Sequence, residues 1–304
     1  MPRVLDPTTL RYFIAICEEG NIAQAAEREA IVASAISKRI LALEEDLGVT
    51  LFVRDRRCVK PTAAGEVLLR QARDILSLMD RTRAELSEFT KGVHGSVRVL
   101  AGFSALIEFL PDDISEFLAG HQSVRVALEE QVSVDIVRAV HEGSADFGIC
   151  WDAVELEGLQ RVSYKSDRLC LVTPADHPLA KLDAIHFADS LEYDHIRVIK
   201  GSLTDIMLQR EARQHDRQIP YRVQVSTFDA ACRMVASKLG ITVLPRQALQ
   251  QPLQDPRIKA IDLLDPWAAR QFVICFRSAD GLTNAAKLLV KHLSDSASQQ
   301  TVHD

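Results

Sequence analysis

Apolar residues recur at helical spacing through the first fifty residues, which predicts three consecutive helices. The first has one apolar face at i, i+3, i+4 and i+7, formed by Leu10, Phe13, Ile14 and Cys17. Gly20 is expected to end this helix. Asn21 is expected to cap the second helix, and Gln24 follows three residues later as in a capping box.

The third predicted helix runs to Leu47 and stops at Gly48. Its expected buried stripe consists of Ile36, Ile40, Leu43 and Leu47. Its other face carries Ala33, Ser34, Ser37, Lys38 and Leu41. Small, polar and basic residues on the outer face of such a helix suit insertion into a DNA major groove. The same three-helix pattern also fits an ordinary helical bundle.

Two short apolar strands follow, at 51–53 and 58–60, and a charged turn joins them. The turn carries the arginines Arg54, Arg56 and Arg57, and Lys60 lies beside it. A basic hairpin next to a three-helix unit is expected to be a wing, whose cations bind DNA phosphates without reading sequence.

A long helix is predicted over 63–91, with Thr62 as its N-cap. Its apolar residues alternate in steps of four and three, interrupted by one threonine: Leu68, Ala72, Ile75, Met79, Thr82, Leu86 and Phe89. A helix of this length would span about 43 Å, too long for its own small domain to cover. We interpret it as a dimerisation helix; the alternative is a helix buried along the C-terminal part.

From residue 95 onward, predicted strands alternate with predicted helices, which indicates a mainly parallel α/β fold. The expected strands are 96–101, 124–129, 145–151, 168–172, 196–199, 222–225, 241–243 and 272–276. The expected helices are 106–119 around Pro111, 135–142, 203–214, 228–238 and 283–294.

Small hydroxyl residues follow three of these strands, where open α/β folds bind ligands. They lie in the turns Phe103-Ser104, Ser202-Leu203-Thr204 and Thr227-Phe228, and Trp151 ends a further strand. Convergence of these turns would form an effector site, and a carboxylate or similar anion is among the ligands it would suit. The competing interpretation makes each hydroxyl a helix cap and Trp151 a core residue.

Composition is that of an ordinary globular protein, with 47% hydrophobic and 26% charged residues over 304 positions. The net charge of −6 resides beyond residue 92, because residues 1–92 hold 14 basic and 14 acidic side chains. No transmembrane stretch and no signal-peptide pattern occur, so we expect a cytoplasmic protein with no membrane partner. The six scattered cysteines are expected to be free thiols.

Catalytic motifs are missing from the sequence. It contains no P-loop, GxGxxG, HExxH or GxSxG pattern, and its nine histidines are dispersed. The sequence therefore predicts neither an enzyme nor a cofactor or metal.

Residues 8–92 resemble the DNA-binding region of LysR-type transcriptional regulators, and a weaker resemblance continues to about residue 295. Seven short matches occur in order at family spacing: Leu10-Arg11-Tyr12-Phe13, Glu18-Glu19-Gly20-Asn21, Ala25-Ala26-Glu27-Arg28, Ala35-Ile36-Ser37-Lys38, Leu43-Glu44-Glu45-Asp46-Leu47-Gly48, Leu51-Phe52-x-Arg54 and Thr62-x-Ala64-Gly65. By this resemblance Ala33, Ser34, Ser37 and Lys38 would read bases, and Arg54 would bind phosphate.

The chain departs from the family where the recognition helix opens. The usual Ser-Gln-Pro is Val32-Ala33-Ser34 here, so the base-contacting amide and the usual capping serine are both missing. We expect Ser34 to replace the cap. Binding energy would then depend more on Lys38 and the wing, and the operators of relatives would not transfer.

The resemblance implies both α+β and α/β parts: a winged helix-turn-helix at 1–62, a linker helix at 63–92 and a regulatory domain at 93–304. The last would resemble periplasmic binding proteins, with one lobe at about 94–165 and 268–295 and the other at 166–267. Implied partners are double-stranded DNA, a small-molecule effector, further copies forming a dimer and then a tetramer, and RNA polymerase. Two alternatives remain open at this point: an architectural DNA-binding protein without effector control, and a solute-binding domain whose helical front end only mediates assembly.

Overall fold

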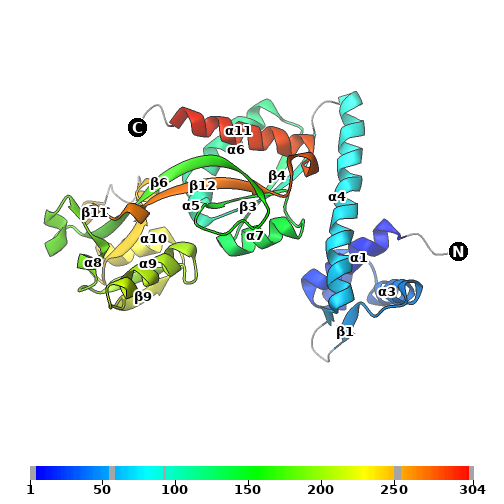
Figure 1. Ribbon diagram of the computed structural model, residues 1–304, viewed down its shortest axis with the longest axis horizontal. Coiled ribbons are helices and arrows are strands. Elements are labelled where there is room, and N and C mark those ends of the chain that lie inside the picture. The colour runs from blue at the N-terminus through cyan, green and yellow to red at the C-terminus, as the bar shows by residue number, and fades with distance from the viewer. Residues whose placement is uncertain (1–4, 55–58, 92–93, 250–254, 301–304) are drawn as a thin grey trace. The chain divides into compact units, whose positions relative to one another are not determined.

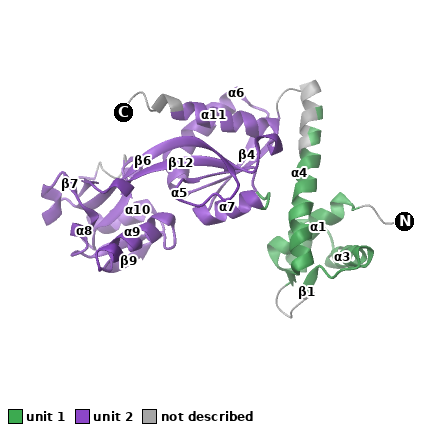
Figure 2. Cartoon of the chain, in the orientation of Figure 1, with its two compact units in different colours: residues 1–92, 142–144 green, residues 93–141, 145–304 purple. Residues whose placement is uncertain are grey.

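The computed structural model describes residues 5–54, 59–91, 94–249 and 255–300, and the chain forms two compact units (Figure 2). Unit 1 comprises residues 1–92 with 142–144, and unit 2 comprises 93–141 with 145–304.

Unit 1 is a winged helix-turn-helix followed by a long helix, as the sequence predicts. Its elements are α1 (Pro7–Glu19), α2 (Ile22–Arg28), α3 (Ala33–Leu47), β1 (Phe52–Arg54), β2 (Val59–Pro61) and α4 (Ala63–Lys91). The antiparallel β1–β2 pair forms the predicted hairpin. α1 starts at Asp6, whose carboxylate accepts hydrogen bonds from the amides of Thr8 and Thr9. It ends at Gly20, in the left-handed conformation with φ of 61°.

The buried stripe of α3 is shorter than expected. Ile36, Ile40 and Leu43 are buried against α1 as predicted, but Leu47 is 42% exposed, so its predicted burial is wrong. Leu47 is the last residue of the helix, and Gly48 reverses the chain immediately after it with φ of 68°. The final turn of α3 therefore extends past the core of the unit.

The N-cap of α2 is the predicted one. The side-chain oxygen of Asn21 accepts hydrogen bonds from the amides of Ala23, at 2.7 Å, and Gln24, at 3.3 Å. These bonds satisfy two donors that have no partner within the helix. Asn21→Ala should lower the free energy of unfolding of unit 1 by about 1 kcal/mol, while Asn21→Ser should cost much less. Thermal or urea denaturation would measure the difference; equal losses for both variants would contradict the capping role.

The start of α4 is fixed by two residues. Thr62 donates to the carbonyl of Thr50 at 2.7 Å and accepts from the amide of Gly65 at 3.1 Å, so it caps the helix as predicted. Gly65 lies so close to β1 that an added Cβ would approach the Leu51 carbonyl oxygen to 2.3 Å. The close approach explains why the sequence has glycine at this turn and holds α4 against the wing.

The apolar seam of α4 divides into two parts. Leu68 and Ala72 are buried in the core of unit 1 itself, together with Phe13, Ile36 and Phe52. Further along, Thr82 is exposed and donates to the carbonyl of Leu78, and Leu86 is 65% exposed. Among the seam residues whose side chains the structure describes, Leu86 in the distal part is the apolar one left exposed within unit 1.

Unit 2 alternates strands and helices around a continuous sheet (Figure 1). Its strands are β3 (Gly95–Ala101), β4 (Val124–Glu130), β5 (Phe147–Trp151), β6 (Gln160–Pro174), β7 (Ala184–Ile185), β8 (His195–Val198), β9 (Tyr221–Val225), β10 (Thr242–Pro245), β11 (Ile258–Leu263) and β12 (Ala269–Phe276). Its α-helices are α5 (Phe103–Glu108), α6 (Leu110–Gly120), α7 (Ser133–His141), α8 (Phe187–Ser190), α9 (Leu203–Gln214), α10 (Phe228–Ala236) and α11 (Asn284–Gln300). Short 3-10 turns lie at Pro178–Lys181, Gln247–Leu249, Pro266–Ala268 and Ala279–Gly281.

Strand order in the sheet is β4-β3-β5-β12-β6-β11-β7, with β10 paired to β6, and β8 pairs in parallel with β9. The sheet is mixed, so the expectation of a mainly parallel sheet is wrong: β12 runs antiparallel to both β5 and β6. β5 and β6 therefore run in the same direction on either side of β12, although residues 152–159 between them form no helix. Along the 15 residues of β6, the first part pairs with β12 and the last part with β10 and β11.

Three further expectations need correction. The predicted helix over 106–119 is two helices that break at Phe109, and Pro111 lies in the first turn of α6, where its missing N–H costs no helical hydrogen bond. The predicted strand at 168–172 begins earlier, at Gln160, in a segment with several polar residues. The strands β7 and β11 were not predicted.

Candidate DNA-binding surface and effector site

The start of α3 is exposed and lacks a side-chain cap. Val32 is the N-cap residue, is 66% exposed and offers no side-chain hydrogen bond, and Ser34 lies inside the helix. The expectation that Ser34 replaces the cap is therefore wrong. Ala33, Ser34 and Lys38 are exposed and Ser37 is half-buried, so all four predicted base-reading positions lie on the accessible side of α3.

Other charged residues near α3 form ion pairs or hydrogen bonds within the protein. The Arg39 guanidinium pairs with Asp6 at 3.0 Å and lies over the Tyr12 ring at 5.8 Å. The Glu44 carboxylate accepts hydrogen bonds from the amides of Leu51, at 2.7 Å, and Phe52, at 3.2 Å, which fixes α3 to the wing. Among the described residues Lys38 forms no ion pair, so its ammonium group is available to a ligand.

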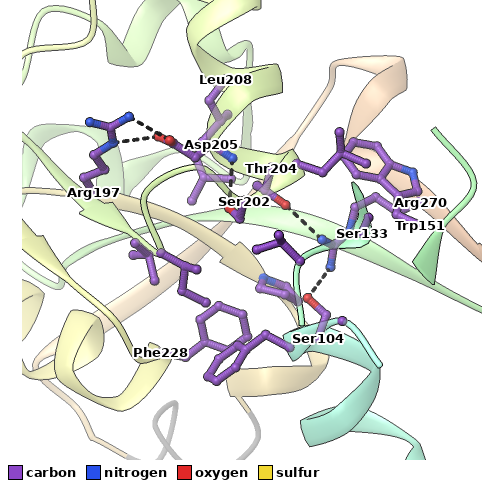
Figure 3. A pocket seen from close by; sticks show the side chains of 18 of the residues that line it. Ser104, Ser133, Trp151, Arg197, Ser202, Thr204, Asp205, Leu208, Phe228 and Arg270 are labelled. Atoms are coloured by element: carbon purple, nitrogen blue, oxygen red, sulfur yellow. Dashed lines mark hydrogen bonds and ion pairs between the residues drawn. The ribbon is translucent and has the colours of Figure 1, made fainter. Parts of the chain in front are cut away.

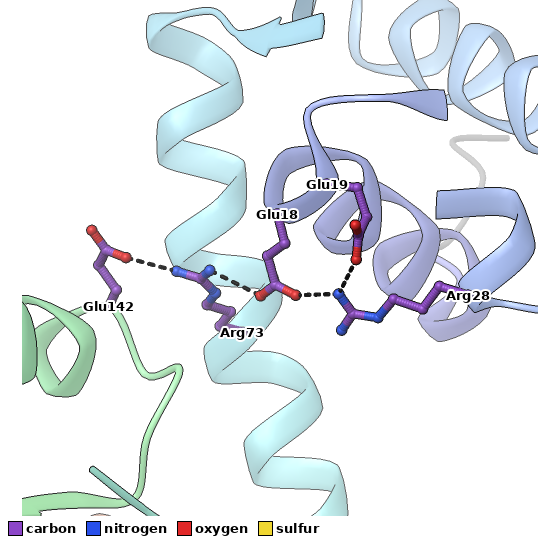
Figure 4. Close-up of polar contacts among 5 residues, drawn as sticks. All are labelled: Glu18, Glu19, Arg28, Arg73 and Glu142. Carbon is purple, nitrogen blue, oxygen red and sulfur yellow. Dashed lines mark hydrogen bonds and ion pairs between the residues drawn. The ribbon is translucent and has the colours of Figure 1, made fainter. Parts of the chain in front are cut away.

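Two more arginines of unit 1 are neutralised in a chain of ion pairs (Figure 4). Arg28 on α2 contacts Glu18 at 2.8 Å and Glu19 at 3.2 Å, and Arg73 on α4 contacts Glu18 at 3.1 Å. The Glu18 carboxylate is the main cause that raises the pKa of Arg28. These pairs connect α1, α2 and α4.

The wing arginines are described only in part. Arg54 is the last residue of β1, opposite Val59 in the hairpin. Arg56 and Arg57 lie outside the described residues. Their phosphate-binding role stays a prediction.

A pocket in unit 2 collects the ends of several strands (Figure 3). It is lined by Gly102, Phe103, Ser104, Glu130, Gln131, Val132, Ser133, Trp151, His195, Ile196, Arg197, Val198, Ile199, Ser202, Leu203, Thr204, Asp205, Leu208, Tyr221, Phe228, Thr242, Val243, Pro245, Arg270 and Phe272. Seven of the eight residues predicted for the effector site are in this set. The rings of Phe103 and Phe228 meet edge-to-face at 4.6 Å and form one apolar wall.

Thr227, the eighth predicted residue, does not line this pocket. Its hydroxyl accepts a hydrogen bond from the amide of Ala230 at 3.2 Å and caps α10. Ser202 does both things, because it caps α9 by accepting from the Asp205 amide and also lines the pocket. The helix-cap interpretation thus describes Thr227 fully and Ser202 in part.

Arg270 is the central polar group of the pocket and is only 4% exposed. Its Nε donates to Asp167 Oδ1 at 2.7 Å, and Nη2 donates to Asp167 Oδ2 across the β6–β12 ladder. Its Nη2 also donates to Ser104 Oγ on α5 and its Nη1 to Thr204 Oγ1 on α9, each at 3.1 Å. One guanidinium therefore joins the hydroxyls of two helices on either side of the pocket.

A second arginine–carboxylate pair lies at the start of α9. Arg197 Nε and Nη2 donate to the two Asp205 oxygens at 2.8 and 2.7 Å, and Asp205 also accepts from the Gly201 amide at 2.8 Å. Burial opposes ionisation of Asp205, but the bonds from Arg197 and Gly201 outweigh it and lower its pKa. His195 behind this pair is neutral at pH 7, because burial lowers its pKa to about 4.

Glu108 on α5 is a buried carboxyl close to the Asp167–Arg270 pair. Both its carboxyl oxygens are enclosed and have no hydrogen-bond partner among the described residues. Burial first, and then the negative charge of Asp167, raise its pKa to about 9. Glu108 is therefore protonated at neutral pH.

The sequence missed the buried ion pairs of the pocket. Asp167 and Arg270 are 103 positions apart, and no local pattern connects them. The Gln131-Val132-Ser133 turn could have been found, because it follows β4 in the same way that Ser104 follows β3. Arg197 and Asp205 flank the predicted turn Ser202-Leu203-Thr204. Arg197 lies on β8, and Asp205 lies in the first turn of α9.

The described residues hold no group of three or more His, Cys, Asp or Glu side chains placed to bind a metal ion. Within the same residues, none of the helices is both long and apolar enough to cross a membrane.

Two family models match the chain and together cover most of it. Residues 7–66 match the bacterial regulatory helix-turn-helix protein of the lysR family, and residues 90–298 match the LysR substrate binding domain. Similar proteins include the uncharacterized HTH-type transcriptional regulator YbhD of Escherichia coli, 26% identical over 92% of this chain and 88% of that protein. The HTH-type transcriptional regulator BenM of Acinetobacter baylyi is 27% identical over 90% of each.

Solved structures share the fold over almost the whole chain. A full-length OxyR variant from Pseudomonas aeruginosa aligns with a TM-score of 0.71 at 20% identity, covering 97% of this chain and 95% of that one. Full-length CbnR in complex with its target DNA aligns with a TM-score of 0.66 at 22% identity, covering 96% of this chain and 100% of that one. The chain thus belongs to the LysR family and is a DNA-binding transcriptional regulator with a two-lobed effector-binding domain, not an enzyme.

Proposed function

We propose that the protein controls a promoter by reading a specific operator with α3 and by sensing a small molecule in the pocket of unit 2. The observation that supports the first part is the exposed start of α3, with Lys38 unpaired among the described residues. In this proposal Ala33, Ser34, Ser37 and Lys38 face base edges, and Arg54, Arg56 and Arg57 bind phosphates. CbnR, which shares the fold, was solved with its target DNA.

The effector site is formed in this proposal by Phe103, Ser104, Trp151, Ser202, Leu203, Thr204 and Phe228, with Thr227 acting only through the cap of α10. Arg270 bonds to hydroxyls of α5 and α9, so a ligand bound among them would shift the equilibrium between two arrangements of the lobes. Residues 94–165 with 268–295 form one lobe and residues 166–267 the other.

Dimerisation is assigned to α4, because Leu78 and Leu86 on its distal half are exposed within unit 1. Two copies joined through residues 63–92 would present two recognition helices to a pseudo-palindromic site. A dimer of dimers, contact with RNA polymerase and action in the cytoplasm complete the proposal.

Two substitutions test the assignment of roles on the DNA-binding surface. Lys38→Ala should lower affinity for an operator selected from random duplexes by about tenfold and should also change which bases are selected. Arg54→Ala should weaken binding to all duplexes alike, by about threefold to tenfold, and should reduce the slope of log affinity against log salt by about one. Fluorescence anisotropy over a salt series, combined with repeated selection, measures both effects.

Lys200→Ala, an exposed lysine of unit 2, serves as the matched control and should change neither property. Wild-type affinity that is equal for selected and random duplexes would favour the architectural alternative. Silent Lys38→Ala and Arg54→Ala variants would contradict the proposed DNA-binding surface.

A further inference from the structure

The pocket contains two arginines, and both are already neutralised by the protein. Arg270 is paired through two of its nitrogens with Asp167, whose side chain is fully buried. Arg197 is paired in the same bidentate way with Asp205. An anionic ligand at either guanidinium would compete with a carboxylate that already balances its charge, and leaving that buried carboxylate unpaired is strongly unfavourable.

The remaining polar groups add no positive charge. Glu130 lines the pocket and makes no ion pair among the described residues. His195 is uncharged at neutral pH because burial lowers its pKa to about 4. At the start of α9 the Gly201 amide donates to the Asp205 carboxylate and the Asp205 amide donates to Ser202 Oγ. The charged groups of the site thus sum to about one excess negative charge.

The pKa of Glu108, a carboxyl group of the protein itself, indicates whether these surroundings favour a negative charge. Glu108 lies near Arg270, yet burial and the charge of Asp167 raise its pKa to about 9. The charge of Arg270 acts in the opposite direction but does not outweigh burial and the charge of Asp167. The surroundings of this ion pair therefore disfavour a second negative charge at Glu108.

Most of the remaining lining residues are apolar or aromatic. Phe103 and Phe228 form the edge-to-face pair, and Leu203 and Ile199 also line the pocket. Ser133 adds a hydroxyl. Such a lining favours a ring-sized apolar body with one hydrogen-bonding group.

Granted the proposed function, in which this pocket holds the effector, we propose that the effector carries no negative charge and is a ring-sized apolar molecule with a hydroxyl or amino group. This differs from the carboxylate suggested by the hydroxyl-bearing turns in the sequence. The turns do converge, but Ser104 and Thr204 are hydrogen-bonded to an Arg270 whose charge Asp167 already balances, so the turns bring together no net positive charge.

Three probes with the same ring and a two-carbon side chain test the charge preference: 2-phenylethanol, 2-phenylethylamine and phenylacetate. Isothermal titration calorimetry on the full-length wild-type protein should give dissociation constants for the alcohol and the amine at least about tenfold lower than for phenylacetate. Phenylacetate binding as tight as that of the alcohol overturns the proposal. Failure of all three probes to bind overturns it as well.

Two charge changes should weaken or abolish the preference. Asp167→Asn leaves Arg270 with an uncompensated charge, and phenylacetate should then bind about tenfold more tightly than to the wild type. Glu130→Lys changes the charge at the exposed rim without touching a buried pair and should favour phenylacetate in the same direction. Glu129→Lys, on the neighbouring residue outside the pocket lining, is the matched control and should leave the order unchanged.

Operator binding by the same preparations separates the two levels of the proposal. A protein that binds its operator but prefers phenylacetate refutes only the ligand class. A protein that prefers the alcohol but binds no operator refutes the DNA-reading part of the proposed function and leaves the ligand class standing.

Discussion

Replacing Ser34 by glutamate is expected to lower operator affinity by at least about 100-fold while leaving unit 1 folded. Ser34 is exposed in the first turn of α3, the segment proposed to enter the major groove. A carboxylate there would face the negative potential of DNA, and a loss of about tenfold in each half-site gives about 100-fold for a dimer. Fluorescence anisotropy with the selected operator measures the change.

The same substitution should not destabilise the helix. Negative charge in the first turn interacts favourably with the helix dipole, by about 0.3–1 kcal/mol, and α3 has no side-chain cap that glutamate would disturb. Ser34→Gln provides the control of equal size without the charge and should keep most of the affinity. If Ser34→Gln and Ser34→Glu lose affinity equally, the effect is steric, and if neither loses any, α3 does not enter the groove as proposed.

Replacing Glu108 by glutamine is expected to raise the free energy of unfolding of unit 2 by about 4 kcal/mol more at pH 8 than at pH 5. In the folded protein the pKa of Glu108 is raised to about 9, from an ordinary value of 4.5. Between these two values the folded state holds a proton that the unfolded state has released. The free energy of unfolding of the wild type therefore falls as pH rises through this window, by at most about 1.4 kcal/mol per pH unit. Glutamine cannot ionise, so the variant lacks this pH dependence.

Urea denaturation at several pH values between 5 and 8.5 measures this effect. Both tryptophans, Trp151 and Trp267, lie in unit 2, so their fluorescence reports its unfolding. Glu129→Gln, at an exposed position of β4, should shift stability little at any pH. A stability difference between wild type and Glu108→Gln that does not grow with pH would show that the carboxyl is ionised in the folded state.

Features of the fold that depend on neighbouring residues could be predicted from the sequence. Asn21 and Thr62 cap helices, and Gly20 and Gly48 end them, because these roles need only a few consecutive residues. The turn at Ser202 was found in the same way, since a strand followed by a capped helix is a local pattern.

Features set by distant partners could not be predicted. The polar start of β6 becomes a strand because it pairs with β12, more than a hundred residues away, and its own alternation is weak. In the sequence, Arg270 resembles any basic residue of a strand, because its partner Asp167 lies on a different strand. The charge of the pocket, and with it the ligand class, depends on that pairing.

The two long strands of unit 2 have a mechanical consequence. Strand β6 runs through both lobes, so the lobes are joined by a continuous strand and not by a flexible linker. One lobe cannot rotate relative to the other without twisting β6 and its partner β12. Their ladder is irregular between Gln271 and Val273, immediately after Arg270. Torsion between the lobes would concentrate at this irregularity in the ladder. A ligand in the pocket would therefore act directly on the backbone at that place.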